Sequence, residues 1–179
     1  MTDSSHNTIQ RVHVHDFKTL LGDGGGLYAL GPQPHSSMEA NWAHGMGSGR
    51  GGGAFYPDEG STDWDIRQTV FSDAASCADN CEWLHVWTKS IRDIVVDGAW
   101  TDTRTMRNDG TNCTVRDVSY VDVKAGATFP PAARAIMSAA GPTSRFVPWA
   151  RPPPPPPPLW LPMARAVRAQ VSGGAQPNR

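Results

Sequence analysis

The stretch Gly24-Gly25-Gly26-Leu27-Tyr28 returns as Gly51-Gly52-Gly53-Ala54-Phe55-Tyr56, which places Tyr56 28 residues after Tyr28. A second pattern precedes each glycine run and occurs three times, as Ile9-x-x-Val12-x-Val14-His15-Asp16, Met38-x-x-Asn41-x-Ala43-His44-Gly45 and Ile66-x-x-Thr69-x-Phe71-Ser72-Asp73. Self-similarity at a nearly fixed period is typical of chains built from stacked structural units. The repeat therefore decides the fold class.

Each unit is predicted to be a short strand, a turn, a second short strand and a turn. Apolar and polar residues alternate in segments 66–70 and 118–123, and weaker copies of the unit begin at Ile94 and Val115. One such unit cannot bury an apolar face alone, whereas stacked units can, with equivalent strands pairing about 4.8 Å apart. We therefore predict an all-β, parallel β-helix (a solenoid) of about five coils over residues 5–124.

The composition changes after the repeats. Residues 125–142 are rich in alanine and are expected to form a short helical segment that closes the β-helix. Residues 143–179 are expected to be a disordered, proline-rich tail, because the seven consecutive prolines at 152–158 must adopt polyproline II and cannot enter a core. The proline run suits either a linker or a docking site for a groove-type binding module.

The charge balance excludes several partner classes. Sixteen basic and seventeen acidic residues give a net charge of −1, so no overall field attracts nucleic acid or anionic lipid. No run of about 18 apolar residues is present for a membrane span, and residues 1–10 lack the pattern of a signal peptide. Three cysteines are too few for a disulfide scaffold, although Cys77 and Cys81 are close enough in sequence to pair. We expect a monomer that binds neither nucleic acid nor membrane.

Three segments resemble the repeats of right-handed parallel β-helix proteins. They are residues 23–28, 53–60 and 90–95, which look like repeats of the pectate-lyase-like superfamily and most resemble its β-helical glycoside-hydrolase-like members. Residues 129–141 are similar to the short helix that follows the last coil in those proteins, so the resemblance covers about residues 5–142. It implies a right-handed coil, carbohydrate processing and, by analogy alone, an extracellular location.

The chain departs from that family in two ways. Family members usually carry paired asparagines at a coil turn, whereas here only Asn41 is present, with Thr69 and Asp97 elsewhere. Family members are also much longer, so the chain is expected to be the C-terminal piece of a longer solenoid. An exposed coil edge would then be a hazard for unwanted strand pairing.

Aligning the strands on Tyr28, Tyr56 and His85 separates an inner from an outer face. The inward set is apolar and consists of Leu27, Ala29, Phe55, Pro57, Leu84 and Val86. The outward set consists of Tyr28, Leu30, Tyr56, Asp58, His85 and Trp87. Because the apolar face of a sugar packs on aromatic rings while its hydroxyls bind polar groups, Tyr28, Tyr56 and Trp87 are the candidate substrate-binding residues.

The carboxyl groups near this column suggest hydrolysis of polysaccharide glycosidic bonds. Glycosidases need two carboxyls roughly 5 Å apart for retention or roughly 6.5–9.5 Å apart for inversion, which neighbouring coils can supply. Our hypothesis is that Asp58 and Glu59 include the general acid, with Asp23 or His85 assisting as base or orienting group. The alternative is that residues 58–61 form only a turn, since Asp, Gly and Ser are turn formers.

Two other functions fit the same residues. A polysaccharide lyase would use calcium and a basic residue such as Lys89 or Arg92, but no aspartate trio at ligand spacing accompanies them. A non-catalytic carbohydrate-binding protein, or a truncated structural solenoid, would bind glycans without cleaving them. No cofactor is expected unless the protein is a lyase.

The histidines form a second repeated feature. His15 and His44 occupy equivalent positions in adjacent coils and are followed by Asp16 and Gly45, and His13 shares a face with His15 in a regular strand. Such a ladder can hold a metal, but it is more often structural, so no metal site is predicted.

Overall fold

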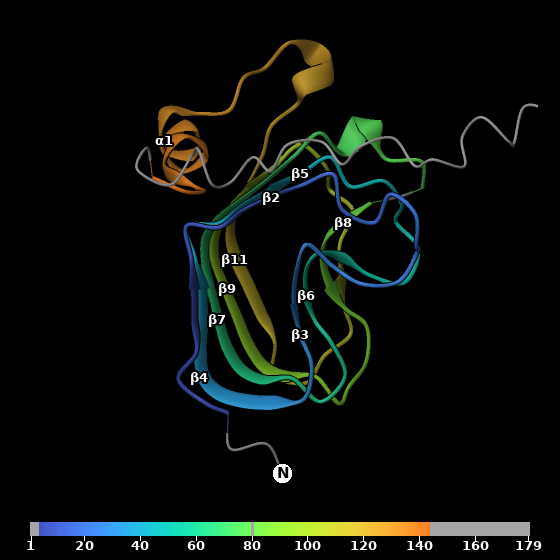
Figure 1. Ribbon diagram of the computed structural model, residues 1–179, viewed down its shortest axis with the longest axis vertical. Helices are drawn as coiled ribbons and strands as arrows, with labels where there is room; N and C mark the ends of the chain where they lie inside the picture. Colours follow the sequence, from blue (N-terminus) through green and yellow to red (C-terminus); the bar gives the residue numbers. More distant parts are fainter. Residues whose placement is uncertain (1–3, 80, 144–179) are drawn as a thin grey trace, which may run out of the picture. The chain divides into compact units, whose positions relative to one another are not determined.

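The computed structural model describes residues 4–79 and 81–143 of the 179-residue chain. It confirms the predicted fold class, an all-β parallel solenoid with a short helix (Figure 1). The proline run and nearly all of the predicted tail lie outside the described residues. The solenoid and helix belong to one compact unit that ends at Pro142.

Two sheets form the walls of the solenoid, and every pairing in them is parallel. The first contains β1 (Thr8–Gln10), β2 (His13–His15), β4 (Pro32–Glu39), β5 (Trp42–His44), β7 (Thr62–Ser72), β9 (Arg92–Thr101) and β11 (Thr114–Tyr120). The second contains β3 (Leu27–Ala29), β6 (Gly53–Pro57), β8 (Glu82–Val86) and β10 (Arg107–Asn108). Short 3-10 helices follow β7 at Ala74–Ser76 and β11 at Val123–Ala125.

The strand register follows the sequence repeat. Ile9 pairs with Met38, Met38 with Ile66, and Ile66 with Val96, which are steps of 29, 28 and 30 residues. The last step, from Val96 to Val115, is only 19 residues. Five strands therefore stack from β1 to β11, and complete turns number about three. In Figure 1 these strands follow one another from blue to yellow.

Alternate residues fill the interior. The predicted inward residues are buried, and so are the apolar residues on the facing sheet: Leu27, Ala29, Phe55, Leu84 and Val86 face Met38, Ala43, Ile66, Phe71 and Val96 in one cluster. Burial of each large side chain contributes roughly 1.5–3 kcal/mol to folding. The period of two in the sequence thus predicts these inward side chains, and in β6 and β8 their neighbours Ala54 and Trp83 are buried as well.

The two glycine runs lie against each other in adjacent coils. The amide of Gly24 donates to the carbonyl of Gly51 at 3.0 Å, and that of Gly26 donates to Gly53 at 3.3 Å. A Cβ placed on Gly52 would lie 2.0 Å from the Gly24 carbonyl oxygen. The glycines therefore allow two backbones to approach more closely than any side chain permits.

The backbone of each of three successive coils bends at a residue with positive φ, which lies between two strands in the first two coils and within β7 in the third. Arg11, Ala40 and Gln68 occupy this corner in successive coils, with φ of 54°, 53° and 48°. The next residue after Ala40 is the buried Asn41. Its Oδ1 accepts the Val12 N–H at 2.8 Å, and its Nδ2 donates to the Ile9 carbonyl at 2.9 Å, so both bonds reach the neighbouring coil. One amide side chain thus satisfies backbone groups that the corner would otherwise leave unpaired.

The short helix predicted within 125–142 is α1 (Pro131–Ala139), which begins with proline at its first position. Its Ala133 is buried against Val70, together with Trp42 and Trp100. Since Trp42, Val70 and Trp100 form one rung of β5, β7 and β9, the helix covers the outer face of that rung. In the described part of the chain, no helix has the length and apolarity needed to cross a membrane.

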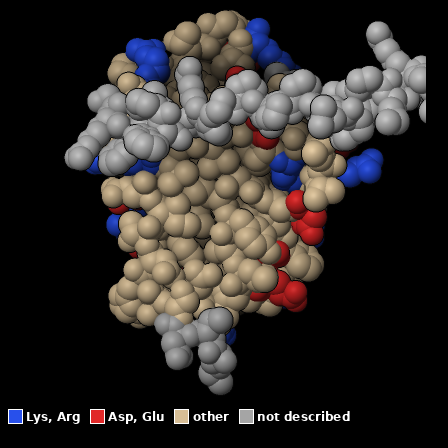
Figure 2. Space-filling model, in the orientation of Figure 1, with Lys and Arg blue, Asp and Glu red and all other residues tan. Residues whose placement is uncertain are grey.

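Figure 2 shows one face of the molecule in space-filling form. Its centre is largely free of charged side chains, and Asp and Glu gather along one side.

Candidate functional site

The predicted aromatic column exists with the expected register. Tyr28 is the direct partner of Tyr56, and the pairing of Phe55 with Leu84 sets Tyr56 opposite His85. The rings meet edge to face, with centroids 5.3 Å apart for the two tyrosines and 4.7 Å apart for Tyr56 and His85. The repeat therefore brings together three side chains that are far apart in the sequence.

Only part of the column is open to solvent. Tyr28 is 44% exposed and Trp87 is 36% exposed, whereas Tyr56 is 4% and His85 is 8% exposed. Tyr56 lies over the glycine runs, where a Cβ on Gly25 would come within 2.8 Å of its Cβ. Tyr56 is therefore buried in the structure, and Tyr28 and Trp87 provide the accessible aromatic surface.

Asp58 lies at the centre of the site. The Tyr28 hydroxyl donates to its Oδ2 at 2.7 Å, and the Trp87 indole N–H donates to its Oδ1 at 2.7 Å. The residues from Asp58 to Ser61 also form a turn, as the turn-forming residues predict. The Ser61 N–H donates to the Asp58 carbonyl, and Gly60 adopts a φ of 77°. The turn thus positions the Asp58 carboxylate between two aromatic side chains.

The hydrogen bonds determine the charge of Asp58. Burial acts to raise the pKa of this carboxyl, but the hydrogen bonds from Trp87, Tyr28 and Tyr56 outweigh it and leave the pKa lowered. Asp58 is therefore ionised at neutral pH. It suits the acceptance of a proton or of a hydroxyl hydrogen bond better than the part of a general acid.

The other proposed catalytic residues have separate environments. Glu59 is exposed. Asp23 is also exposed, and its Oδ1 accepts the Gly24 N–H at 2.8 Å. His85 is bound through Nδ1 to Glu82, a partner that the sequence reasoning did not include. The side chains that hydrogen-bond to Asp58 are therefore aromatic ones.

A hollow of about 520 Å³ adjoins Trp87. The sequence alone does not predict that Asn108 and Asp109 line it. Its lining comprises Trp87, Thr88, Lys89, Asn108, Asp109 and Gly110. Asn108 belongs to β10, which pairs with β8 and so continues the sheet that carries the aromatic column. Because the last repeat is shorter than the others, the repeat period does not predict this register. Hydrogen-bonding side chains thus stand next to an exposed indole.

The tyrosines should report the charge on Asp58. The hydrogen bond to Asp58, and then burial, raise the pKa of Tyr28 to about 12, and burial followed by the same carboxylate raises the pKa of Tyr56. Since a tyrosine in the unfolded chain ionises near 10, the folded state keeps protons that the unfolded state loses. Stability should fall as pH rises from about 10 to 12.

Absorbance at 295 nm measures this ionisation directly. We expect Asp58→Asn to move part of the tyrosine titration down toward the ordinary value, because the carboxylate that opposes the phenolate is gone. Identical titrations of the two proteins would contradict the central role given to Asp58.

A second cavity contains a different carboxyl. It measures about 340 Å³ and is lined by Asp102, Lys124 and the disulfide-bonded pair Cys77 and Cys81, among others. Burial raises the pKa of Asp102, although backbone hydrogen bonds, with Ala74 foremost, oppose the shift. Among the described residues, this is the carboxyl with a raised pKa, and it does not contact the aromatic column.

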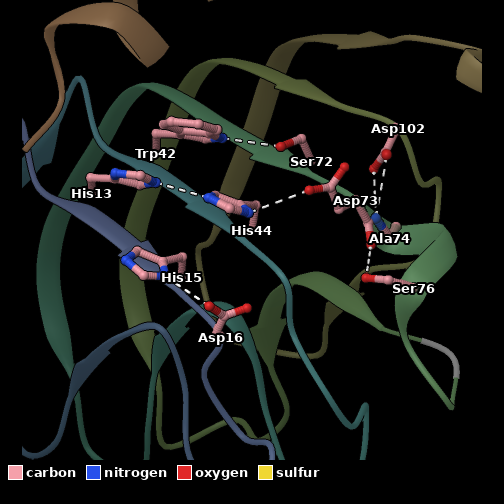
Figure 3. Close-up of polar contacts among 10 residues, drawn as sticks. All are labelled: His13, His15, Asp16, Trp42, His44, Ser72, Asp73, Ala74, Ser76 and Asp102. Atoms are coloured by element: carbon pink, nitrogen blue, oxygen red, sulfur yellow. Dashed lines mark hydrogen bonds and ion pairs between the residues drawn. The ribbon is translucent and has the colours of Figure 1, made fainter. Parts of the chain in front are cut away.

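The histidine ladder forms a separate polar cluster (Figure 3). His15 and His44 are strand partners, as predicted. The direct ring contact, however, is diagonal, with His13 Nε2 2.8 Å from His44 Nε2. His44 Nδ1 lies 3.3 Å from Asp73, and His15 Nδ1 lies 2.9 Å from Asp16. Burial, and then the charges of His44 and His15, lower the pKa of His13, so that its ring is neutral at neutral pH.

Comparison of the chain with protein-family models, with curated proteins and with solved structures finds no match.

Proposed function

We propose that this protein binds carbohydrate on the surface formed by Tyr28, Asp58 and Trp87, together with the hollow beside Trp87. The observation that carries the proposal is one carboxyl group held between two partly exposed aromatic side chains by hydrogen bonds of 2.7 Å. The repeats resemble those of the pectate-lyase-like superfamily, and we extend the proposal to a glycan-binding β-helix of that type.

The chemistry of the surface suits a sugar ring. The exposed indole and phenol offer apolar faces on which the C–H face of a sugar can pack. Asp58 accepts hydrogen bonds from hydroxyl groups, and its fixed position lowers the entropy lost on binding. In the hollow, Lys89, Asn108 and Asp109 supply further donors and acceptors.

Binding is better supported than cleavage. Hydrolysis of a glycosidic bond needs a protonated carboxyl next to the leaving oxygen, and the pKa of Asp58 is lowered. Glu59 is exposed at the following turn position and is the carboxyl left to act as an acid. The proposal is therefore recognition, and cleavage is an outcome for the test to reveal.

Affinity electrophoresis of the full chain in gels containing plant and algal polysaccharides tests the proposal. We expect retardation by at least one glycan, and Trp87→Ala should weaken it at least about tenfold because it removes the stacking surface. Asp58→Asn should weaken it too, since the charged acceptor is lost. Tyr120→Ala is the matched control, because Tyr120 is 38% exposed and contacts Arg104 elsewhere on the solenoid.

Retardation that is unchanged by Trp87→Ala, or equally reduced by Tyr120→Ala, would contradict the proposed surface. The same samples are assayed for new reducing ends and for unsaturated products that absorb in the ultraviolet. Reducing ends that depend on Glu59 would reveal hydrolysis, and unsaturated products that require calcium would reveal a lyase.

A further inference from the structure

Two imidazole nitrogens converge between neighbouring strands of the first sheet. His13 is in β2 and His44 is in β5, and their Nε2 atoms lie 2.8 Å apart (Figure 3). The two rings are close to coplanar, with 26° between their planes. In the neutral pair only one Nε2 carries a hydrogen, so the other presents a lone pair toward the same point.

Asp73 selects the tautomer of His44. Its carboxylate lies 3.3 Å from His44 Nδ1, where it can accept the ring N–H. This leaves the lone pair of His44 on Nε2, the atom that faces His13. A carboxylate behind an imidazole is the usual arrangement around metal-binding histidines, because it fixes the ring and raises the basicity of the ligand nitrogen.

Trp42 stacks on the rings of both His13 and His44. Its indole stacks on His13 with centroids 4.1 Å apart and 4° between the planes, and on His44 with centroids 4.5 Å apart. The indole is itself held by a hydrogen bond from Nε1 to Ser72 at 3.0 Å. The ring centroid of His15 lies 5.0 Å from that of His13 and 5.7 Å from that of His44. Rings that are already ordered lose little freedom when they bind a ligand.

We propose that His13 and His44 bind a divalent transition-metal ion, such as Zn²⁺, Ni²⁺ or Cu²⁺, through their Nε2 atoms. Neutral imidazole nitrogen is a preferred ligand of these ions, and Cu²⁺ should bind most tightly by the general order of affinities. The site is separate from the carbohydrate surface and does not depend on that proposal.

Binding requires the ring hydrogen that His13 Nε2 donates to His44 Nε2 to move to His13 Nδ1, and it requires a small adjustment of the geometry. Metal–nitrogen bonds of about 2.0–2.1 Å place two ligands of a tetrahedral ion about 3.3 Å apart, so the rings must separate by about half an ångström. Within residues 4–79 and 81–143, no three His, Cys, Asp or Glu side chains already converge on one point. The site therefore supplies two protein ligands, with water in the remaining positions, and His15 is the nearest imidazole that could become a third.

Calorimetric titration of Zn²⁺ into the full chain, prepared without a histidine tag, tests the site. We expect one saturable site per chain, with affinity reduced at least tenfold in His13→Gln and in His44→Gln. His35→Gln is the matched control, because that imidazole also pairs with a carboxylate, Asp63 at 2.8 Å, but lies on β4 outside the cluster. Circular dichroism of each variant establishes that it is folded.

Asp73→Asn keeps both ligand nitrogens and changes only the group behind His44. It should weaken Zn²⁺ binding by about 10–100-fold, the usual effect of losing such a partner. Electron paramagnetic resonance of the Cu²⁺ complex should show two coordinated imidazole nitrogens, or three if His15 turns inward. The proposal is overturned if the wild type shows no saturable binding, or if His13→Gln, His44→Gln and His35→Gln bind alike.

Discussion

Replacing Gly52 with alanine is expected to lower the free energy of unfolding by more than about 4 kcal/mol. The new Cβ would lie 2.0 Å from the Gly24 carbonyl oxygen and 2.9 Å from the ring of Tyr56. The φ of +149° adds strain, because residues with a side chain rarely adopt it. Since the obstacle is backbone in a paired coil, the two coils must separate to make room. Urea denaturation followed by circular dichroism measures the loss.

Gly24→Ala is the control for this variant. Gly24 also has a positive φ, +115°, but a Cβ there meets no heavy atom within 4 Å. We expect a loss of about 1–3 kcal/mol from backbone strain alone. Equal losses in the two variants would show that close stacking of the glycine runs contributes little to stability.

Replacing Asn41 with leucine is expected to destabilise the protein by about 2–4 kcal/mol. Leucine has a similar volume, so the change removes hydrogen bonds without opening a cavity. The Val12 N–H and the Ile9 carbonyl, at 2.8 and 2.9 Å from the Asn41 amide, would both lose their partner. An unpaired polar group in a buried position costs about 1–3 kcal/mol. Thermal and urea unfolding of both proteins measure the difference.

Thr69 provides the comparison, because it occupies the position of Asn41 in the next coil, one residue before the Trp42–Val70 pair. It is fully buried, and its hydroxyl has no hydrogen-bond partner among the described residues. Thr69→Val should therefore be neutral or stabilising. A large loss in Thr69→Val, or none in Asn41→Leu, would contradict the role given to the asparagine.

Strand register could be predicted where the repeat has a constant length. In a parallel stack, equivalent residues occupy equivalent places, so the pairings of Tyr28 with Tyr56 and of Met38 with Ile66 follow from the sequence. The sequence pattern predicts that the fourth copy begins at Ile94, whereas Ile66 pairs with Val96. An offset of two residues preserves the side of the sheet, so the predicted core was unaffected.

The candidate site could be predicted in position but not in detail. Periodicity places Asp58 and Trp87 one coil apart, but it does not show that they share a hydrogen bond. It also does not show that Tyr56 is covered, which depends on the backbone of the glycine runs. For the histidines, strand pairing places His15 opposite His44. The side-chain conformations, however, bring the ring of His13 into hydrogen-bond contact with that of His44. Such diagonal contacts depend on rotamers, which sequence patterns do not specify.

The parallel register has a consequence for how the molecule loses structure. Among the described residues, each strand of the first sheet pairs only with strands of the coil before it and the coil after it, as β7 does with β4 and β5 on one side and with β9 on the other. Such a chain behaves as a one-dimensional array, in which each coil is stabilised by its interfaces with the neighbouring coils. Amide protons of β7 should exchange with solvent most slowly, and protection should decline toward β1 and β11. A break in the middle coil would leave two short stacks that unfold independently.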